Sequence, residues 1–223
     1  MWHTLHGLTY GRSLGRLAMF YGTDKGGDHD YIPHYQMHFA AIRKGRLRVL
    51  EIGIGGYNDP KSGGASLRMW RAYFPNAQII GVDLHEKSWH REKRITTIQA
   101  DQSDRESLRQ LAEAITEVDI IIDDGSHVNS HVIATFETLF PLVRPGGFYA
   151  IEDTQTSYWS EFGGNPESHD DPHTTMGYFR KLVDEINRPE FRSTSGESSL
   201  VKDVVAFHFY HNLILLQKKG TIS

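Results

Sequence analysis

Cysteine is absent from the 223-residue chain, so neither a disulfide nor a thiolate metal site can form. Any metal bound to this protein must therefore be held by oxygen or imidazole ligands. A cysteine-free chain also suits a reducing compartment, and we expect a cytoplasmic protein.

An excess of basic charge is also lacking, because 24 Lys and Arg residues stand against 28 Asp and Glu residues. We expect no nucleic-acid partner, since no strong basic field is available to hold a phosphate backbone. The chain has no run of 18 apolar residues, and its first residues lack the apolar centre of a signal peptide, so no membrane partner is expected. We expect a soluble, intracellular protein with a single domain overall.

Strand-like and helix-like segments alternate between residues 47 and 151. Five β-rich apolar runs stand out, at residues 46–53, 77–84, 94–101, 118–124 and 144–153. The helical spacing between them predicts a parallel sheet with helices on both faces. Residues 201–219 instead hold two β-rich runs with a tight link near His211 and Asn212, which only antiparallel strands allow. The sequence predicts an α/β fold whose seven-stranded, mostly parallel sheet ends in an antiparallel C-terminal hairpin.

Two segments lie outside this alternation. Residues 1–46 look helical around the polar loop GTDKGGDHD, and we interpret them as an N-terminal cap and lid ahead of a core over residues 47–223. Residues 155–172 are polar, aromatic and glycine-containing. They follow the fifth strand directly, so we expect a surface loop over the site.

The first expected strand ends in LEIGIGG, with Glu51 followed by Gly53, Gly55 and Gly56. Glycines let a backbone turn sharply and approach a ligand closely. A nicotinamide dinucleotide site needs G-x-G-x-x-G opening directly into a helix, but here a loop over residues 57–64 intervenes. The carboxylate of Glu51 suits an amine-bearing ligand better than a diphosphate. S-adenosylmethionine, with an amine, a sulfonium and no phosphate, fits these features, and an NAD-dependent oxidoreductase is the alternative.

Carboxylates also end the next two strands. Asp83 ends the second strand, where a carboxylate can accept hydrogen bonds from both hydroxyls of a ribose. Asp101 and Gln102 end the third strand and suit the amine and ring edge of a base. Together they predict an adenosine-containing ligand across the carboxyl ends of the strands.

Four more carboxylates follow the fourth and fifth strands, in Asp123-Asp124 and Glu152-Asp153. Neighbouring strands lie roughly 4.8 Å apart, so these groups would repel one another unless a cation lies between them. All-oxygen ligation indicates a hard ion, Mg²⁺ first, with Ca²⁺ or Mn²⁺ open. Successive strand residues alternate faces, so we predict Asp124, Glu152 and Asp153 as metal ligands. Asp123 would then orient the cofactor or the strand end.

His127 lies three residues beyond Asp124, across a glycine-containing turn. An imidazole titrates near neutrality and can take a proton from a hydroxyl that a metal ion has polarised. We therefore predict His127 as the general base of a methyl transfer to a hydroxyl group. The competing interpretation is structural: the two aspartates would cap the next helix, and the Glu-Asp pair would form an ion pair with a nearby Arg or Lys.

Several motifs taken together resemble a known family. The stretches YGTDKGG, LEIGIGGY, GGASLRMW, IDDGSHVNSHV and LVRPGGFYAIEDTQTSYW resemble the metal-dependent sugar O-methyltransferases of macrolide biosynthesis. That family includes the mycinamicin VI 2''-O-methyltransferase and the macrocin O-methyltransferase. The resemblance covers about residues 20–218. It implies a class I (Rossmann-like) methyltransferase fold, S-adenosylmethionine and Mg²⁺, with the metal ligands and base already named.

The resemblance also implies that the loop GTDKGGDHDY closes over cofactor and substrate. The predicted cofactor contacts are Thr23, Lys25, Glu51, Gly53, Gly55, Tyr57, Asp83, Asp101, Gln102 and Asp123. The predicted substrate contacts are Tyr31, Gln155, Tyr158 and Trp159. Members of the family carry a long N-terminal extension, whereas this chain begins almost at the core, which leaves a homo-oligomer and the identity of the acceptor open.

The sequence thus predicts an S-adenosylmethionine- and Mg²⁺-dependent O-methyltransferase that acts on a sugar hydroxyl of a glycosylated natural product or polysaccharide. A catechol- or phenol-directed O-methyltransferase would use the same metal chemistry on an aromatic diol. A non-catalytic protein that binds S-adenosylmethionine is the third alternative, although it would have no need for a metal and a base.

Overall fold

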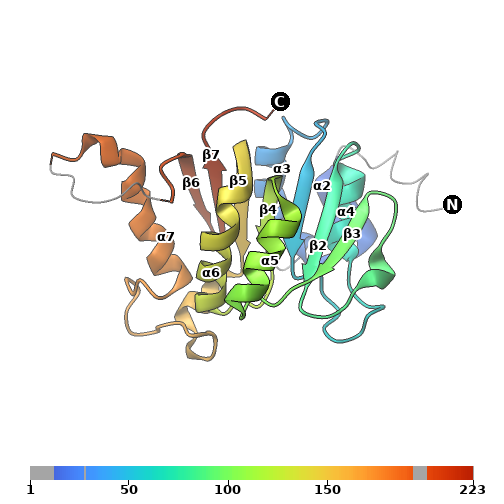
Figure 1. The fold of residues 1–223 in the computed structure, drawn as a ribbon, viewed down its shortest axis with the longest axis horizontal. Coiled ribbons are helices and arrows are strands. Elements are labelled where there is room, and N and C mark those ends of the chain that lie inside the picture. Colours follow the sequence, from blue (N-terminus) through green and yellow to red (C-terminus); the bar gives the residue numbers. More distant parts are fainter. Residues whose placement is uncertain (1–12, 28, 193–199, 223) are drawn as a thin grey trace. The chain divides into compact units, whose positions relative to one another are not determined.

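The computed structural model describes residues 13–27, 29–192 and 200–222. The chain forms two compact units, residues 1–100 and residues 101–222, and most of their α-helices and strands are labelled in Figure 1. The division at residue 46 into a cap and a core stays a prediction. Residues 1–12 and Asp28, which belong to the predicted cap and lid, lie outside the described residues.

The N-terminal unit contains three parallel strands in the order β3-β2-β1. These are β1 (Arg48–Ile52), β2 (Gln78–Asp83) and β3 (Ile95–Gln99). Its helical elements are α2 (Leu14–Tyr21), η1 (Asp24–Gly26), α3 (Ile32–Phe39), α4 (Ala65–Tyr73) and η2 (Ser88–His90). The pairing of Glu51 with Gly81 and of Asp83 with Gln99 brings the carboxyl ends of the strands to one edge.

An aromatic cluster holds α3 and α4 together. The ring of Trp70 packs edge-on against Tyr35 at 5.3 Å and stacks near Phe74 at 6.0 Å, and all three side chains are fully buried. Leu67 and Trp70 of α4 and Phe74, which directly follows the helix, lie in the core because residues three to four apart share a helix face.

The C-terminal unit contains four strands in the order β4-β5-β7-β6. These are β4 (Val118–Asp123), β5 (Val143–Glu152), β6 (Val204–Tyr210) and β7 (Leu213–Lys218). β4 and β5 are parallel, whereas β7 runs antiparallel to both β5 and β6 (Figure 1). The C-terminal hairpin is therefore confirmed, and Asn212 makes its tight turn with a φ of 57°.

The same unit also contains helical elements. They are α5 (Arg105–Ile115), α6 (Asn129–Leu139), η3 (Phe140–Leu142), η4 (Thr154–Tyr158), η5 (Ser160–Phe162), α7 (Thr175–Val183) and η6 (Asp184–Glu190). In the described part of the chain, no helix combines the length and the apolar character needed to cross a bilayer.

Asp104 caps α5 by accepting the Glu106 N–H, and the neighbouring Ser103 hydroxyl donates to Asp101. Residues 155–172 are not simply a surface loop, since η4 and η5 give their first part 3₁₀ structure and bury Thr156 and Ser157.

Candidate metal and cofactor sites

The ends of β4 and β5 bring three predicted site residues together. Asp123 pairs with Ile151, so the residues after each strand lie at one edge of the sheet. Asp124, His127 and Asp153 each offer a ligand atom there, all within 4.8 Å of one another. The Nε2 atom of His127 lies 3.5 Å from Asp153 Oδ2 and 3.9 Å from Asp124 Oδ1. An imidazole between two partly exposed carboxylates suits both a divalent cation and proton transfer.

Two members of this cluster have an unusual backbone conformation. His127 has a φ of 57° and Asp153 a φ of 53°, in the left-handed region that few residues with side chains adopt. Such conformations persist only where the surrounding structure enforces them, and they are concentrated at functional sites. The geometry of the cluster therefore depends on the contacts that hold the turns around it.

Glu152, the third predicted metal ligand, ends β5 and is only 3% exposed. It is not one of the three residues in the cluster, where His127 is the third group. Its role as a ligand stays a prediction.

Asp123 is buried at the end of β4 and is not one of the three clustered groups. Burial raises the pKa of its carboxyl to about 7. Gln102 Nε2 donates a hydrogen bond of 2.8 Å to Asp123 Oδ1. Burial beside Asp123 also raises the pKa of Tyr149 well above its usual value. The role of Asp123 in orienting the cofactor or the strand end stays a prediction.

At the end of β3, Asp101 accepts hydrogen bonds from the Ser103 hydroxyl at 2.7 Å and from the Ser103 N–H at 2.8 Å. These bonds lower the pKa of Asp101, so the carboxylate form is favoured. Its contact with the amine of a base stays a prediction.

In the N-terminal unit, Lys25 and Glu51 form an ion pair. The Lys25 Nζ atom lies 3.2 Å from Glu51 Oε1, and the two side chains are 1% and 0% exposed. Breaking such a pair would leave an uncompensated buried charge. The structure thus brings together two predicted cofactor contacts from segments far apart in the sequence.

The glycines after β1 turn the backbone as predicted. Gly53, Gly55 and Gly56 have φ values of 78°, 73° and 79°. A Cβ atom on Gly56 would lie 2.1 Å from the Ser62 carbonyl oxygen, so close packing within the loop also requires glycine there. Asp83 supports the same region by accepting the Ile54 N–H at 3.2 Å.

Sequence reasoning missed two residues that hold this loop. Lys87 is 2% exposed and donates to the carbonyl oxygens of Asp59 at 2.7 Å and Ser62 at 3.3 Å. His90 Nε2 lies 3.0 Å from the same Ser62 oxygen. Neither leaves a signal in the sequence, because the partners are backbone carbonyls more than 20 residues away.

The remaining predicted contacts differ in exposure. Tyr57 is 89% exposed, whereas Tyr31 is 1% exposed and lies beside His29. Thr23 donates a long hydrogen bond of 3.4 Å to Asp24. In η4 and just after it, Tyr158 and Trp159 are 37% and 45% exposed, and Gln155 has a buried carbonyl oxygen without a hydrogen-bond partner in the described structure. Their ligand contacts stay predictions.

Asn129 is a further residue that sequence reasoning missed. Its fully buried amide donates to the carbonyl oxygens of Thr156 at 3.0 Å and Phe162 at 2.9 Å, and it accepts the Thr175 N–H at 2.6 Å. Asn129 starts α6, two residues after His127. It therefore ties the turn that carries His127 to η4, η5 and α7.

We expect Asn129→Asp to destabilise the protein by about 3 kcal/mol, because a carboxylate oxygen would face two carbonyl oxygens in a buried site. Thermal unfolding should show a midpoint lowered by roughly 6–12 °C. Asn76→Asp is the control, because that exposed amide makes a single bond to the Lys44 carbonyl. Equal unfolding midpoints for the two variants would contradict the role of Asn129 in holding this turn against η4, η5 and α7.

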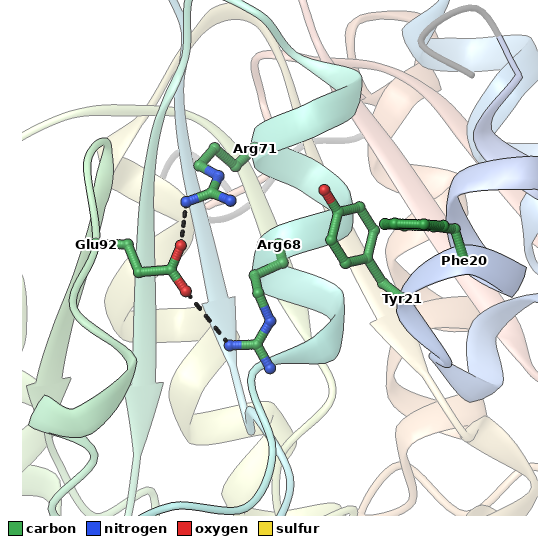
Figure 2. A pocket seen from close by; sticks show the side chains of 5 residues that line it. All are labelled: Phe20, Tyr21, Arg68, Arg71 and Glu92. Atoms are coloured by element: carbon green, nitrogen blue, oxygen red, sulfur yellow. Dashed lines mark hydrogen bonds and ion pairs between the residues drawn. The ribbon is translucent and has the colours of Figure 1, made fainter. Parts of the chain in front are cut away.

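A separate pocket lies in the N-terminal unit, between α2 and α4. It has a volume of about 430 Å³ and is lined by Phe20, Tyr21, Arg68, Arg71 and Glu92. Figure 2 shows Glu92 reaching both arginines, with the two aromatic rings on the other side. No predicted site residue lines this pocket, and its charges are largely paired internally.

Known proteins resemble this chain in sequence. Residues 61–154 match a family described as a methyltransferase domain. The 8-demethyl-8-alpha-L-rhamnosyl tetracenomycin-C 2'-O-methyltransferase of Streptomyces olivaceus is 48% identical over 93% of this chain and 55% of that protein. The mycinamicin VI 2''-O-methyltransferase of Micromonospora griseorubida is 45% identical over 92% of this chain and 52% of its own length. The chain thus spans about half the length of these relatives.

Solved structures also resemble this chain. MycE, a methyltransferase of the mycinamycin biosynthetic pathway determined with Mg and S-adenosylhomocysteine, is 44% identical and matches with a TM-score of 0.88 over 95% of this chain and 56% of that one. A more distant O-methyltransferase from Bacillus cereus, 15% identical with a TM-score of 0.51, shows the same fold alone. The predicted fold class is confirmed. The chain is a homologue, over about half of their length, of the sugar O-methyltransferases of macrolide and tetracenomycin biosynthesis, and it has the class I methyltransferase fold.

Proposed function

We propose that this chain provides an S-adenosylmethionine- and Mg²⁺-dependent O-methyltransferase that acts on a sugar hydroxyl of a glycosylated small-molecule acceptor. The supporting observation is the cluster of Asp124, His127 and Asp153 at the end of β4 and β5, in a chain homologous to O-methyltransferases of rhamnosyl tetracenomycin C and mycinamicin VI. The related MycE structure contains both Mg and the product of the methyl donor.

The residues of the cluster fit a divalent cation. Asp124 and Asp153 supply the hard oxygen ligands that Mg²⁺ prefers, and their ligand atoms already lie within reach of one ion. Glu152, at the end of the same strand, is the proposed third ligand. When bound, the ion lowers the pKa of a coordinated hydroxyl and fixes its position.

His127 would act as the general base. Its Nε2 atom accepts the proton of the acceptor hydroxyl, and the carboxylates of Asp124 and Asp153 stabilise the imidazolium that results. S-adenosylmethionine supplies the methyl group, and its sulfur keeps the electrons of the broken bond. The partial exposure of all three side chains leaves room for the acceptor to approach.

The cofactor contacts predicted from the sequence are part of this proposal. The glycine turn after β1, with Asp83 and the Lys25–Glu51 pair, gives the N-terminal unit a polar environment suited to an adenosine and an amine. We also propose that the enzyme works in the cytoplasm on a small molecule, without a nucleic-acid or membrane partner, in agreement with its net charge of −4.

Calorimetric titration of S-adenosylhomocysteine, with Mg²⁺ and then with EDTA, tests the cofactor. We expect saturable binding in both conditions, because the proposed adenosine contacts do not involve the metal ligands, and no heat from an NAD control. Binding of NAD without binding of S-adenosylhomocysteine would overturn the proposed function in favour of an oxidoreductase.

A further inference from the structure

The amide of Gln102 is occupied by protein partners. Its Nε2 atom donates to Asp123 Oδ1 at 2.8 Å and to Thr135 Oγ1 at 3.2 Å, which uses both amide hydrogens. Its Oε1 atom accepts the Ser126 N–H at 2.8 Å. These partners belong to the end of β4, to α6 and to the turn between them. A side chain held in this way has no amide hydrogen left to donate to the adenine base of a cofactor.

Gly125 lies against the side-chain amide of Gln102. A Cβ atom at Gly125 would lie 2.0 Å from Gln102 Oε1 and 2.7 Å from its Cδ atom. Gly125 does not have the positive φ that usually explains a glycine in a turn. The amide cannot swing away without losing its hydrogen bonds. The glycine of the DDGSH motif is therefore required by the close approach of Gln102, not by the local backbone conformation.

The turn held by Gln102 carries two residues of the candidate metal site. Asp124 and His127 flank the contact between Gln102 and Ser126, and His127 has the left-handed conformation that needs external support. We propose that Gln102 is a positioning residue, which fixes the turn of Asp124 and His127 for metal binding and does not contact the adenine of the cofactor. This inference rests on the proposed function and reassigns one of its predicted cofactor contacts.

The experiment compares two affinities in Gln102→Ala and the unsubstituted protein. Mn²⁺ affinity is measured by electron paramagnetic resonance, and S-adenosylhomocysteine affinity by calorimetry. We expect the Mn²⁺ dissociation constant to rise about 10-fold or more, as for other groups that orient metal ligands, while the S-adenosylhomocysteine constant changes less than about 3-fold. Weaker S-adenosylhomocysteine binding with unchanged Mn²⁺ binding would overturn the inference.

Controls separate this effect from a general loss of structure. Gln110→Ala removes a glutamine that bonds to Glu106 on the exposed face of α5, and it should change neither affinity. If Gln102→Ala does not fold, Gln102→Met keeps the length of the side chain and carries the same test. Failure of the unsubstituted protein to bind either probe would refute the proposed function itself.

A double substitution tests the contact independently of any ligand. Gly125→Ala should open the turn in the unsubstituted protein and speed amide exchange at Ser126 about 10-fold or more, because the new methyl group displaces Gln102. In the Gln102→Ala background that obstacle is gone, so Gly125→Ala should add less than about a 3-fold change. Equal effects in both backgrounds would overturn the proposal.

Discussion

Replacing His127 by alanine is expected to lower the rate of methyl transfer by roughly 10²- to 10⁴-fold, the usual contribution of a positioned general base. The imidazole lies between two carboxylates, and no other histidine belongs to the described cluster. Initial rates would be measured with labelled S-adenosylmethionine and a panel of glycosylated acceptors. The affinity for S-adenosylhomocysteine should stay within about 3-fold, since His127 is not among the proposed cofactor contacts.

His173→Ala is the matched control. His173 is an exposed histidine in the same unit, and it lies outside the metal cluster. Its removal should leave the rate unchanged. Full activity of the His127→Ala variant would eliminate the general-base assignment, and a parallel loss in both variants would point to a change in folding instead.

Removal of the metal is expected to have the second large effect. Chelation with EDTA should abolish methyl transfer, and added Mg²⁺ should restore it. Asp153→Asn should raise the Mn²⁺ dissociation constant by at least about 10-fold, because an anionic oxygen ligand is replaced by a neutral amide. Electron paramagnetic resonance of Mn²⁺ and the dependence of the rate on Mg²⁺ concentration would report these changes.

Two further variants make the metal experiment decisive. Asp170→Asn is the control, because that carboxylate is exposed, forms an ion pair with Arg180 and lies outside the metal cluster. Glu152→Gln tests the ligand predicted from the sequence but absent from the observed cluster. We expect it also to weaken Mn²⁺ binding. Undiminished activity in EDTA would remove the metal from the mechanism altogether.

Much of the fold could be predicted from local patterns. The apolar runs that became β1 to β5 are nearly continuous, as buried parallel strands require, and the link at Asn212 is too short for anything but a hairpin. The helix α7 was not foreseen. Its buried face includes Phe179, whose ring centroid lies 4.7 Å from that of Phe136 of α6, and this tertiary contact stabilises the helix.

The candidate site, like the fold, could be predicted from the sequence only in part. The sequence alone determined which side chains end neighbouring strands, and so it identified Asp124, His127 and Asp153. The periodicity of a strand in the sequence predicts where the strand ends and which residues alternate between its two faces. It does not show how a turn beyond the strand folds, so only the structure gives the distances from His127 to Asp124 and Asp153, and Glu152 stays a predicted metal ligand.

Only the tertiary structure decided what holds these groups in place. Gln102, Asn129 and Lys87 each bind backbone or side-chain atoms more than 20 residues away. A polar side chain whose partners are distant backbone groups has the same appearance in a sequence as one that faces solvent. Its role follows from the position of those groups in space, and that position exists only once the chain has folded.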